Sequence, residues 1–152
     1  MSNSTLAGYI LIADDDVDDI EILTTALNEA NSGLEVLVAD NGKTVLERLE
    51  TLVQADAGTL PCVLVMDMNM PKMDGRETVV ALKSNAGLKN IPILLFSTAK
   101  NKTDELFAEK WGVHFYQKPD SIQGLNDIAH FIITICHTRT DDVQIEEINH
   151  RL

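Results

Sequence analysis

The sequence has few basic residues, only two cysteines and no long apolar run. Its 152 residues include 12 lysines and arginines against 24 aspartates and glutamates, which gives a formal net charge of −12. Such an acidic surface does not favour nucleic acid or anionic membranes, because both need basic groups that neutralise phosphates. We therefore expect neither nucleic acid nor a membrane as a partner.

The small number of cysteines and the absence of a long apolar run exclude further classes of protein. Cys62 and Cys136 each lie inside an apolar run, which is typical of reduced core thiols in a cytoplasmic protein and not of a disulfide framework. No apolar run approaches the roughly 18 residues of a membrane span. Residues 1–10 contain no basic region ahead of an apolar stretch, so no signal peptide is predicted and a cytoplasmic location is expected.

Short apolar runs alternate with helical patterns along the chain. Each run is continuous, which is typical of a strand buried on both faces, and each is followed by apolar residues at helical spacing. The strands are expected at residues 9–13, 34–39, 62–66, 91–96 and 113–117, and the helices at residues 17–30, 45–53, 76–84, 103–111 and 121–137.

This alternation indicates an α/β fold, in which helices cover both faces of a parallel sheet. Right-handed crossovers leave few topologies, and we predict a flavodoxin-like, doubly wound (βα)5 domain with strand order 2-1-3-4-5. The length suits one such domain. We expect it at residues 1–138, with residues 139–152 as an acidic tail or as an extension of the last helix.

Polar side chains follow four of the predicted strands. Because the carboxyl ends of parallel strands share one edge of the sheet, these side chains are expected to converge. Clustered carboxylates repel one another, and Mg²⁺ removes the repulsion by taking their oxygens as ligands. A lysine and a hydroxyl beside such an ion suit a phosphoryl group. The residues are Asp14, Asp15 and Asp16, then Asp67, then Ser97 and Thr98, then Lys118.

The acidic run has a second interpretation. The acids from Asp15 to Glu21 open a predicted helix, and the helix dipole favours negative charge at that end. On its own the run would be typical of a capped helix start. Its placement together with Asp67 and Lys118 favours a shared site.

The segment around Asp67 reads VLVMDMNMPKMDG and resembles the phosphoacceptor segment of response-regulator receiver domains, the CheY-like family. The segments ILIADDD, IPILLFST and FYQKP resemble the first, fourth and fifth strands of that family, in the same order. The resemblance spans about residues 8–137. It implies a stand-alone receiver of a two-component system that is similar to receivers paired with phytochrome-type histidine kinases.

The resemblance also implies roles for particular residues. Asp67 would accept a phosphoryl group from a sensor histidine kinase or a histidine phosphotransfer protein. Mg²⁺ would be bound by Asp15 and Asp67 directly, by Asp14 through water and by the backbone carbonyl of Asn69. The protein would not act as an enzyme on other molecules, although it would hydrolyse its own phosphoryl group.

Other residues would hold the phosphoryl group and respond to it. Lys118 would contact its oxygens, and the peptide bond from Lys118 to Pro119 is often cis in the family. The backbone amides of Asn69 and Thr98 would assist.

The resemblance places the switch at two further positions. Ser97 occupies the switch hydroxyl position, where the family more often has threonine, and Thr98 is the rival hydroxyl. Phe115 occupies the aromatic switch position, with core packing as its alternative role. On phosphorylation Ser97 would move toward the phosphoryl group, and the face formed by the fourth helix, the fifth strand and the last helix would change shape.

The output of this receiver is expected to be a protein–protein interaction or a phosphorelay, because no output domain follows in the sequence. The last predicted helix has a core stripe and a second apolar stripe beside it. Three alternatives explain the second stripe. The tail covers it, a second chain covers it in a homodimer through the last helix and tail, or the core-facing side of the helix is simply wide. The core stripe is Ile122, Leu125, Ala129, Ile132 and Cys136, the second is Ile128, Phe131 and Ile135, and the tail residues are Val143, Ile145 and Ile148.

Two rival functions remain. The D-x-D pattern of Asp14 and Asp16 is also the nucleophile motif of haloacid-dehalogenase-type phosphatases, which use Mg²⁺ as well. Such enzymes need a longer chain and a later acidic pair, and the segment around Asp67 would then be unexplained. A degenerate receiver that serves only as a binding module is disfavoured because every charged position of the site is filled.

Overall fold

The computed structural model describes residues 8–30, 33–55 and 59–151, and their side chains through residue 138. Five parallel strands form one sheet in the order β2-β1-β3-β4-β5, and a helix follows each strand, so the predicted (βα)5 fold and its strand order are confirmed. The strands are β1 (Tyr9–Ala13), β2 (Glu35–Ala39), β3 (Val63–Asp67), β4 (Ile93–Ser97) and β5 (His114–Gln117). The helices are α1 (Val17–Glu29), α2 (Gly42–Ala55), α3 (Gly75–Lys83), α4 (Lys102–Trp111) and α5 (Ile122–Arg151).

The central strands are buried along their length, as their continuous apolar runs predicted. Every residue of β3 and β4 is buried, whereas most residues of the edge strands β2 and β5 are partly or fully exposed. The register pairs Ala13 with Met66 and Asp67 with Phe96. The strands therefore end at one edge of the sheet, where the polar residues begin.

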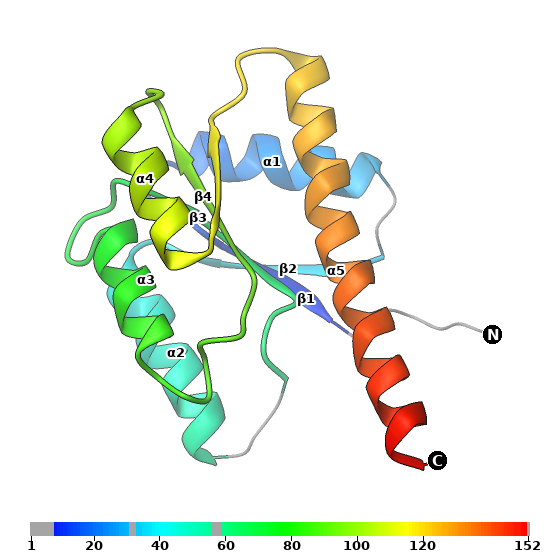
Figure 1. The fold of residues 1–152 in the computed structure, drawn as a ribbon. Coiled ribbons are helices and arrows are strands. Elements are labelled where there is room, and N and C mark those ends of the chain that lie inside the picture. Colours follow the sequence, from blue (N-terminus) through cyan, green and yellow to red (C-terminus); the bar gives the residue numbers. More distant parts are fainter. Residues whose placement is uncertain (1–7, 31–32, 56–58, 152) are drawn as a thin grey trace.

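Helices cover both faces of the sheet. Figure 1 shows α2, α3 and α4 together on one side of the sheet, and α1 and α5 on the other. Alternate residues of β1 serve the two layers: Leu11 and Ala13 pack in the core cluster beneath α2–α4, while Ile10 and Ile12 pack in the cluster beneath α1 and α5. The predicted loop at residues 55–61 lies partly outside the described residues.

Gly75 lets α3 begin close against the end of β3. A Cβ atom at this position would lie 2.8 Å from the carbonyl oxygen of Asp67 and 2.9 Å from Cα of Met68. The Gly75 amide donates a hydrogen bond of 2.9 Å to the Met68 carbonyl, and Asp74 and Glu77 form a capping box over the first turn. A larger residue at position 75 would push the helix away from the strand end that carries Asp67.

Cys62 and Cys136 form a disulfide, so the prediction of two reduced thiols is wrong. Their Cα atoms lie 5.0 Å apart although the residues are 74 positions apart in the sequence. Cys62 precedes β3 and packs, partly buried, against the core cluster beneath α1 and α5, to which Cys136 on α5 belongs. The sequence shows each apolar run, but not that the two runs face one another.

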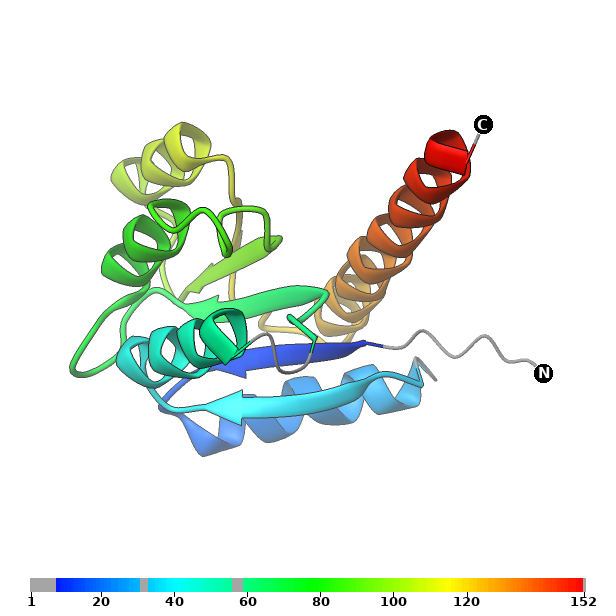
Figure 2. The ribbon, with the colours of Figure 1, turned by 90° about the horizontal axis from the view of Figure 1, so that it is seen from below.

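Helix α5 continues into the segment that was expected to form either a tail or an extension of the last helix. The apolar pattern predicted its end at His137, but the helix runs on to Arg151, which agrees with the second alternative, and Figure 2 shows its C-terminal part extending beyond the sheet. Ile122 is 79% exposed, so its assignment to the core stripe is wrong. Ala129, Ile132 and Cys136 are buried as expected.

The second apolar stripe of α5 is largely covered by the domain itself. Ile128 is buried, and the Phe131 ring packs edge-on against His114 at 5.1 Å and obliquely against Tyr116 at 5.4 Å. A wide core face thus accounts for much of this stripe. The side chains of Val143, Ile145 and Ile148, which were candidates to cover it, lie outside the described part of the chain.

Candidate functional site

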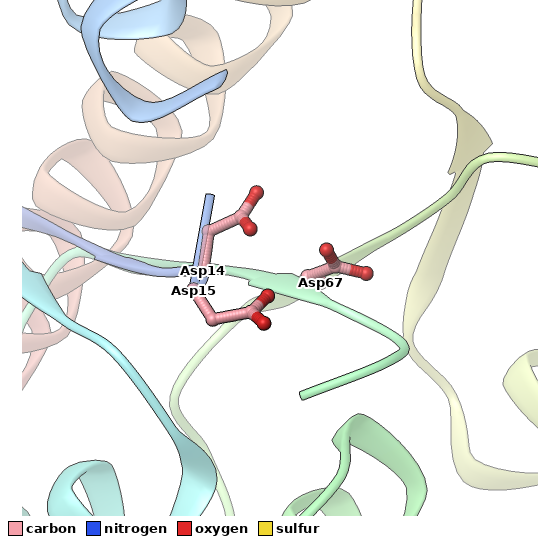
Figure 3. A group of neighbouring side chains, drawn as sticks. All are labelled: Asp14, Asp15 and Asp67. Atoms are coloured by element: carbon pink, nitrogen blue, oxygen red, sulfur yellow. The ribbon is translucent and has the colours of Figure 1, made fainter. Parts of the chain in front are cut away.

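Three carboxylates gather at the carboxyl edge of the sheet. Asp14 and Asp15 directly follow β1 and Asp67 ends β3, and one oxygen from each lies within 4.8 Å of the others. Figure 3 shows the three side chains directed into the same space. Asp14 and Asp67 are buried, with 7% of each residue exposed, while Asp15 faces solvent. This is the convergence that the strand ends predicted.

Lys118 brings a positive charge to these carboxylates from the end of β5. Its Nζ donates hydrogen bonds to Oδ2 of Asp67 at 3.0 Å and to Oδ2 of Asp14 at 3.1 Å. A third bond, of 2.6 Å, goes to Oδ2 of Asp19 in the first turn of α1. The sequence analysis did not include Asp19, because acidic residues are common in the first turn of a helix. The signal for it in the sequence is its position as the third residue of the helix, from which its side chain can reach the site.

Asp16 has a different role from its two neighbours. Its carboxylate accepts hydrogen bonds from the backbone amides of Asp18 and Asp19 and caps α1. Its own amide donates to Oδ1 of Asp14 at 2.9 Å. Asp16 therefore caps the helix, as one interpretation of the acidic run predicted, whereas Asp14 and Asp15 lie beside Asp67.

Burial and charge shift the proton affinities of two of these groups. Burial, reinforced by the charge of Asp67, raises the pKa of Asp14 to about 6 against the opposing effects of the Asp16 amide and Lys118. Burial opposes the charged form of Lys118. Its hydrogen bonds to Asp19 and Asp67 and the nearby carboxylate charges outweigh that effect and raise the pKa of Lys118 well above its usual range. The lysine is thus firmly protonated at neutral pH.

The side of the site next to β4 is arranged differently. The Asn69 amide donates to Oδ1 of Asp67 at 2.9 Å. The Ser97 hydroxyl, in contrast, donates to the Ala99 carbonyl at 2.8 Å and accepts from the Ala99 amide at 3.3 Å, so it is engaged in its own loop. Thr98 is exposed. The structure brings Asn69 to Asp67 and leaves the Ser97 hydroxyl turned toward Ala99.

Two further predicted positions lie near the end of β5. Phe115 is half-buried and packs against the core cluster beneath α2–α4. The peptide bond between Lys118 and Pro119 is trans, as are the others in the described part of the chain, so the expectation of a cis bond is wrong.

An ion pair that the sequence analysis missed joins α3 to α4. The Arg76 guanidinium donates to the carboxylate of Asp104, which is 5% exposed and sits in the first turn of α4. The guanidinium also lies 5.7 Å from the centre of the Phe107 ring. Arg76 and Asp104 line one pocket together with Asn69, Ser97 and Thr98. No spacing in the sequence links two residues on different helices, so no signal could have found this pair.

The chemistry of the cluster suits a hard cation and an anion side by side. Carboxylate oxygens in a group this tight are the ligands that Mg²⁺ prefers, and one carboxylate is exposed enough to admit it. An ammonium group on the same carboxylates can neutralise an incoming phosphoryl oxygen.

Within the described residues no helix is both long and apolar enough to cross a membrane.

Comparison with known proteins gives consistent matches. The sequence model of the response regulator receiver domain matches residues 10–129. Response regulator Rcp1 of Synechocystis sp. is 26% identical over 107 residues, which covers 70% of this chain and 73% of Rcp1. Chemotaxis protein CheY1 of Helicobacter pylori is 33% identical over 121 residues, which covers 77% of this chain and 93% of CheY1.

The fold has a similar match among solved structures. The crystal structure of the phosphorylated cyanobacterial phytochrome response regulator RcpA superposes with a TM-score of 0.73 at 27% identity. That match covers 82% of this chain and 90% of RcpA.

Proposed function

Because the chain belongs to the response regulator receiver domain family, we propose that Asp67 is its phosphoacceptor and receives a phosphoryl group from a histidine kinase or a histidine phosphotransfer protein. The observation that carries this proposal is the geometry of Asp67. Its carboxylate ends a buried strand and lies between the Asn69 amide and the Lys118 ammonium. In the transfer, the bond from phosphorus to the donor's imidazole nitrogen breaks as a bond to an Asp67 oxygen forms.

The chain is a two-component response regulator and not a haloacid-dehalogenase-type phosphatase. The structure gives a physical reason for rejecting the rival. Such an enzyme needs Asp16 beside Asp14 in the site, but the carboxylate of Asp16 is occupied with the amides that begin α1.

The carboxylate cluster supports a divalent cation, and receiver domains use such an acidic pocket for it. Asp14, Asp15, Asp67 and the carbonyl of Asn69 would hold Mg²⁺. When bound, the ion would neutralise phosphoryl oxygens during transfer. Lys118 would neutralise another phosphoryl oxygen, since it already spans Asp14 and Asp67. The Thr98 and Asn69 amides would hold the remaining oxygen.

The response to phosphorylation would run through β4. Ser97 would leave Ala99 and turn its hydroxyl to the phosphoryl group, and Phe115 would follow into the space that Ser97 vacates. Ser97 is buried at 4% exposure, so its hydroxyl needs a new partner when it leaves the old one. The face made by α4, β5 and α5 then changes shape.

The output would be a protein–protein contact or a relay of the phosphoryl group. The protein would not act as an enzyme on another substrate. It would function in the cytoplasm, where histidine kinases obtain their nucleotide. Residues 1–138 would form the receiver unit. Residues 139–152, which continue α5 as far as Arg151, would join a second copy of the chain in a homodimer. Sedimentation velocity of the full chain tests the homodimer, and a monomer across the whole concentration range would contradict it.

The phosphoacceptor is tested by replacing Asp67 with Asn. We expect the wild type to gain one phosphoryl group from acetyl phosphate in a Mg²⁺-dependent reaction, measured by intact-protein mass spectrometry, and Asp67→Asn to gain none. Asp16→Asn is the matched control, since it removes the same charge nearby and should keep phosphorylation. Phosphorylation of Asp67→Asn at the wild-type level would overturn the proposal.

A further inference from the structure

Lys118 is held by a carboxylate that stands apart from the metal-binding group. Of its three hydrogen-bond partners, Asp14 and Asp67 belong to the tight carboxylate cluster, whereas Asp19 comes from α1. Among the described residues, Asp19 is the one carboxylate partner of Lys118 outside that cluster. Its bond is also the shortest of the three, at 2.6 Å.

Loading of the site sets Lys118 in competition with a cation. The ammonium and a divalent ion both need the oxygens of Asp14 and Asp67, and their like charges repel. The lysine must therefore loosen its hold on these oxygens when the ion arrives. Only 18% of the Lys118 side chain is exposed, so water cannot fully replace a lost partner.

We propose that Asp19 is a positioning residue that keeps the Lys118 ammonium over the site when its other two partners, Asp14 and Asp67, would be taken up by a metal ion and phosphoryl oxygens would take their place as acceptors. An ammonium group has three donors, and in this structure all three are used. Asp19 retains one of them throughout. The other two are then free to turn from the carboxylates to the phosphoryl oxygens. This role rests on the proposed function of Asp67.

The neighbouring Asp18 provides a matched control. Asp18 and Asp19 are both acids in the first turn of α1, so each contributes similarly to the helix dipole and to the net charge. Asp18 is exposed, and Lys118 bonds Asp19 and not Asp18. A difference between Asp18→Asn and Asp19→Asn therefore isolates the bond to Lys118.

The first measurement is the affinity for Mg²⁺ alone, by isothermal titration calorimetry on the full chain. In Asp19→Asn the lysine keeps only Asp14 and Asp67 as carboxylate partners, and it competes with Mg²⁺ for both. We therefore expect the Mg²⁺ affinity of Asp19→Asn to fall about five-fold and the Mg²⁺ affinity of Asp18→Asn to change less than about two-fold. Asp19→Glu keeps the charge and should recover part of the loss. Equal urea midpoints for Asp18→Asn and Asp19→Asn exclude a merely structural effect.

The second measurement is the affinity for beryllofluoride, a phosphoryl mimic, at saturating Mg²⁺. We expect Asp19→Asn to bind it about five-fold more weakly than Asp18→Asn, since Lys118 is less well placed for the mimic. Equal affinities of the two variants for both probes would overturn the role of Asp19 while leaving Asp67 as the phosphoacceptor. A wild type that binds neither probe would overturn both proposals.

Discussion

The two faces of the sheet are fastened in different ways. On the face covered by α1 and α5, the disulfide of Cys62 and Cys136 ties α5 to the start of β3, and Lys118 joins three carboxylates. On the face covered by α2, α3 and α4, an ion pair between Arg76 and Asp104 joins α3 to α4.

This difference indicates which side of Asp67 can move. The side with the acids is already assembled, because Lys118 bridges Asp14, Asp19 and Asp67 before any ligand arrives. The Ser97 hydroxyl on the other side is bonded only within its own loop, to Ala99 two residues on. Under the proposed function, a phosphoryl group on Asp67 would draw Ser97 away at the cost of these local bonds, and rearrangement would start at β4 and α4.

Reduction of the disulfide should weaken the face covered by α1 and α5 and has the largest expected effect. The disulfide closes a loop of 74 residues, and chain entropy predicts that its reduction lowers the free energy of unfolding by about 4 kcal/mol. The measurement is urea unfolding of the wild type with and without dithiothreitol. Cys62→Ala is the control, since its stability should not respond to the reductant. An unchanged wild-type midpoint on reduction would contradict the prediction.

Removal of Arg76 would weaken the other face by a smaller amount. Arg76→Met leaves the buried Asp104 carboxylate without its cation, and because the Arg76 side chain is 40% exposed we expect a loss of about 2 kcal/mol in unfolding free energy. Lys100→Met is the matched control: its pair with Glu105 is long and exposed, and its loss should cost under about 0.5 kcal/mol.

A double variant checks that the effect belongs to the pair. Arg76→Met combined with Asp104→Asn should regain part of the stability, because no charge is then left buried. Losses that simply add would show that the two residues act independently.

The acid cluster itself should respond to pH. The pKa of Asp14 in the folded chain is about 6, above the 3.8 of an unperturbed aspartate. Asp14 therefore favours the folded, metal-free state at low pH, and this contribution is lost as the pH rises through about 6. Mg²⁺ needs the ionised form, so its affinity should fall by up to about ten-fold per pH unit below pH 6.

Calorimetric titration of the wild type with Mg²⁺ from about pH 5 to pH 8 measures this effect. Proton release on binding should be largest near the pKa of Asp14, and buffers with different ionisation enthalpies reveal it. A constant affinity across that range would show that Asp14 is not a ligand.

The strands and most of the carboxylate cluster could be predicted from the sequence because they depend on local order. Asp14, Asp15, Asp67 and Lys118 each follow a buried run, and parallel strands bring their ends together whatever the details of packing.

Features that depend on how two helices or loops meet could not be predicted. The pairing of Cys62 with Cys136 joins residues 74 positions apart, and that of Arg76 with Asp104 joins two helices. Ile122 has the right spacing for the core stripe of α5 yet is 79% exposed at the first residue of the helix. Spacing predicts which side chains share one face of a helix, but not which part of that face packs against the rest of the protein.

Because α5 is long, a small tilt of the helix near the sheet would produce a larger displacement at its C-terminal end. The helix is clamped to the sheet at Cys136 and runs on to Arg151, a distance of about 22 Å at 1.5 Å per residue. A tilt of only about 5° at the clamp would carry the far end through about 2 Å, because a straight helix transmits rotation along its axis. Small adjustments of the α5 contacts with β5, where Phe131 meets His114 and Tyr116, would therefore be magnified at a distance from the sheet.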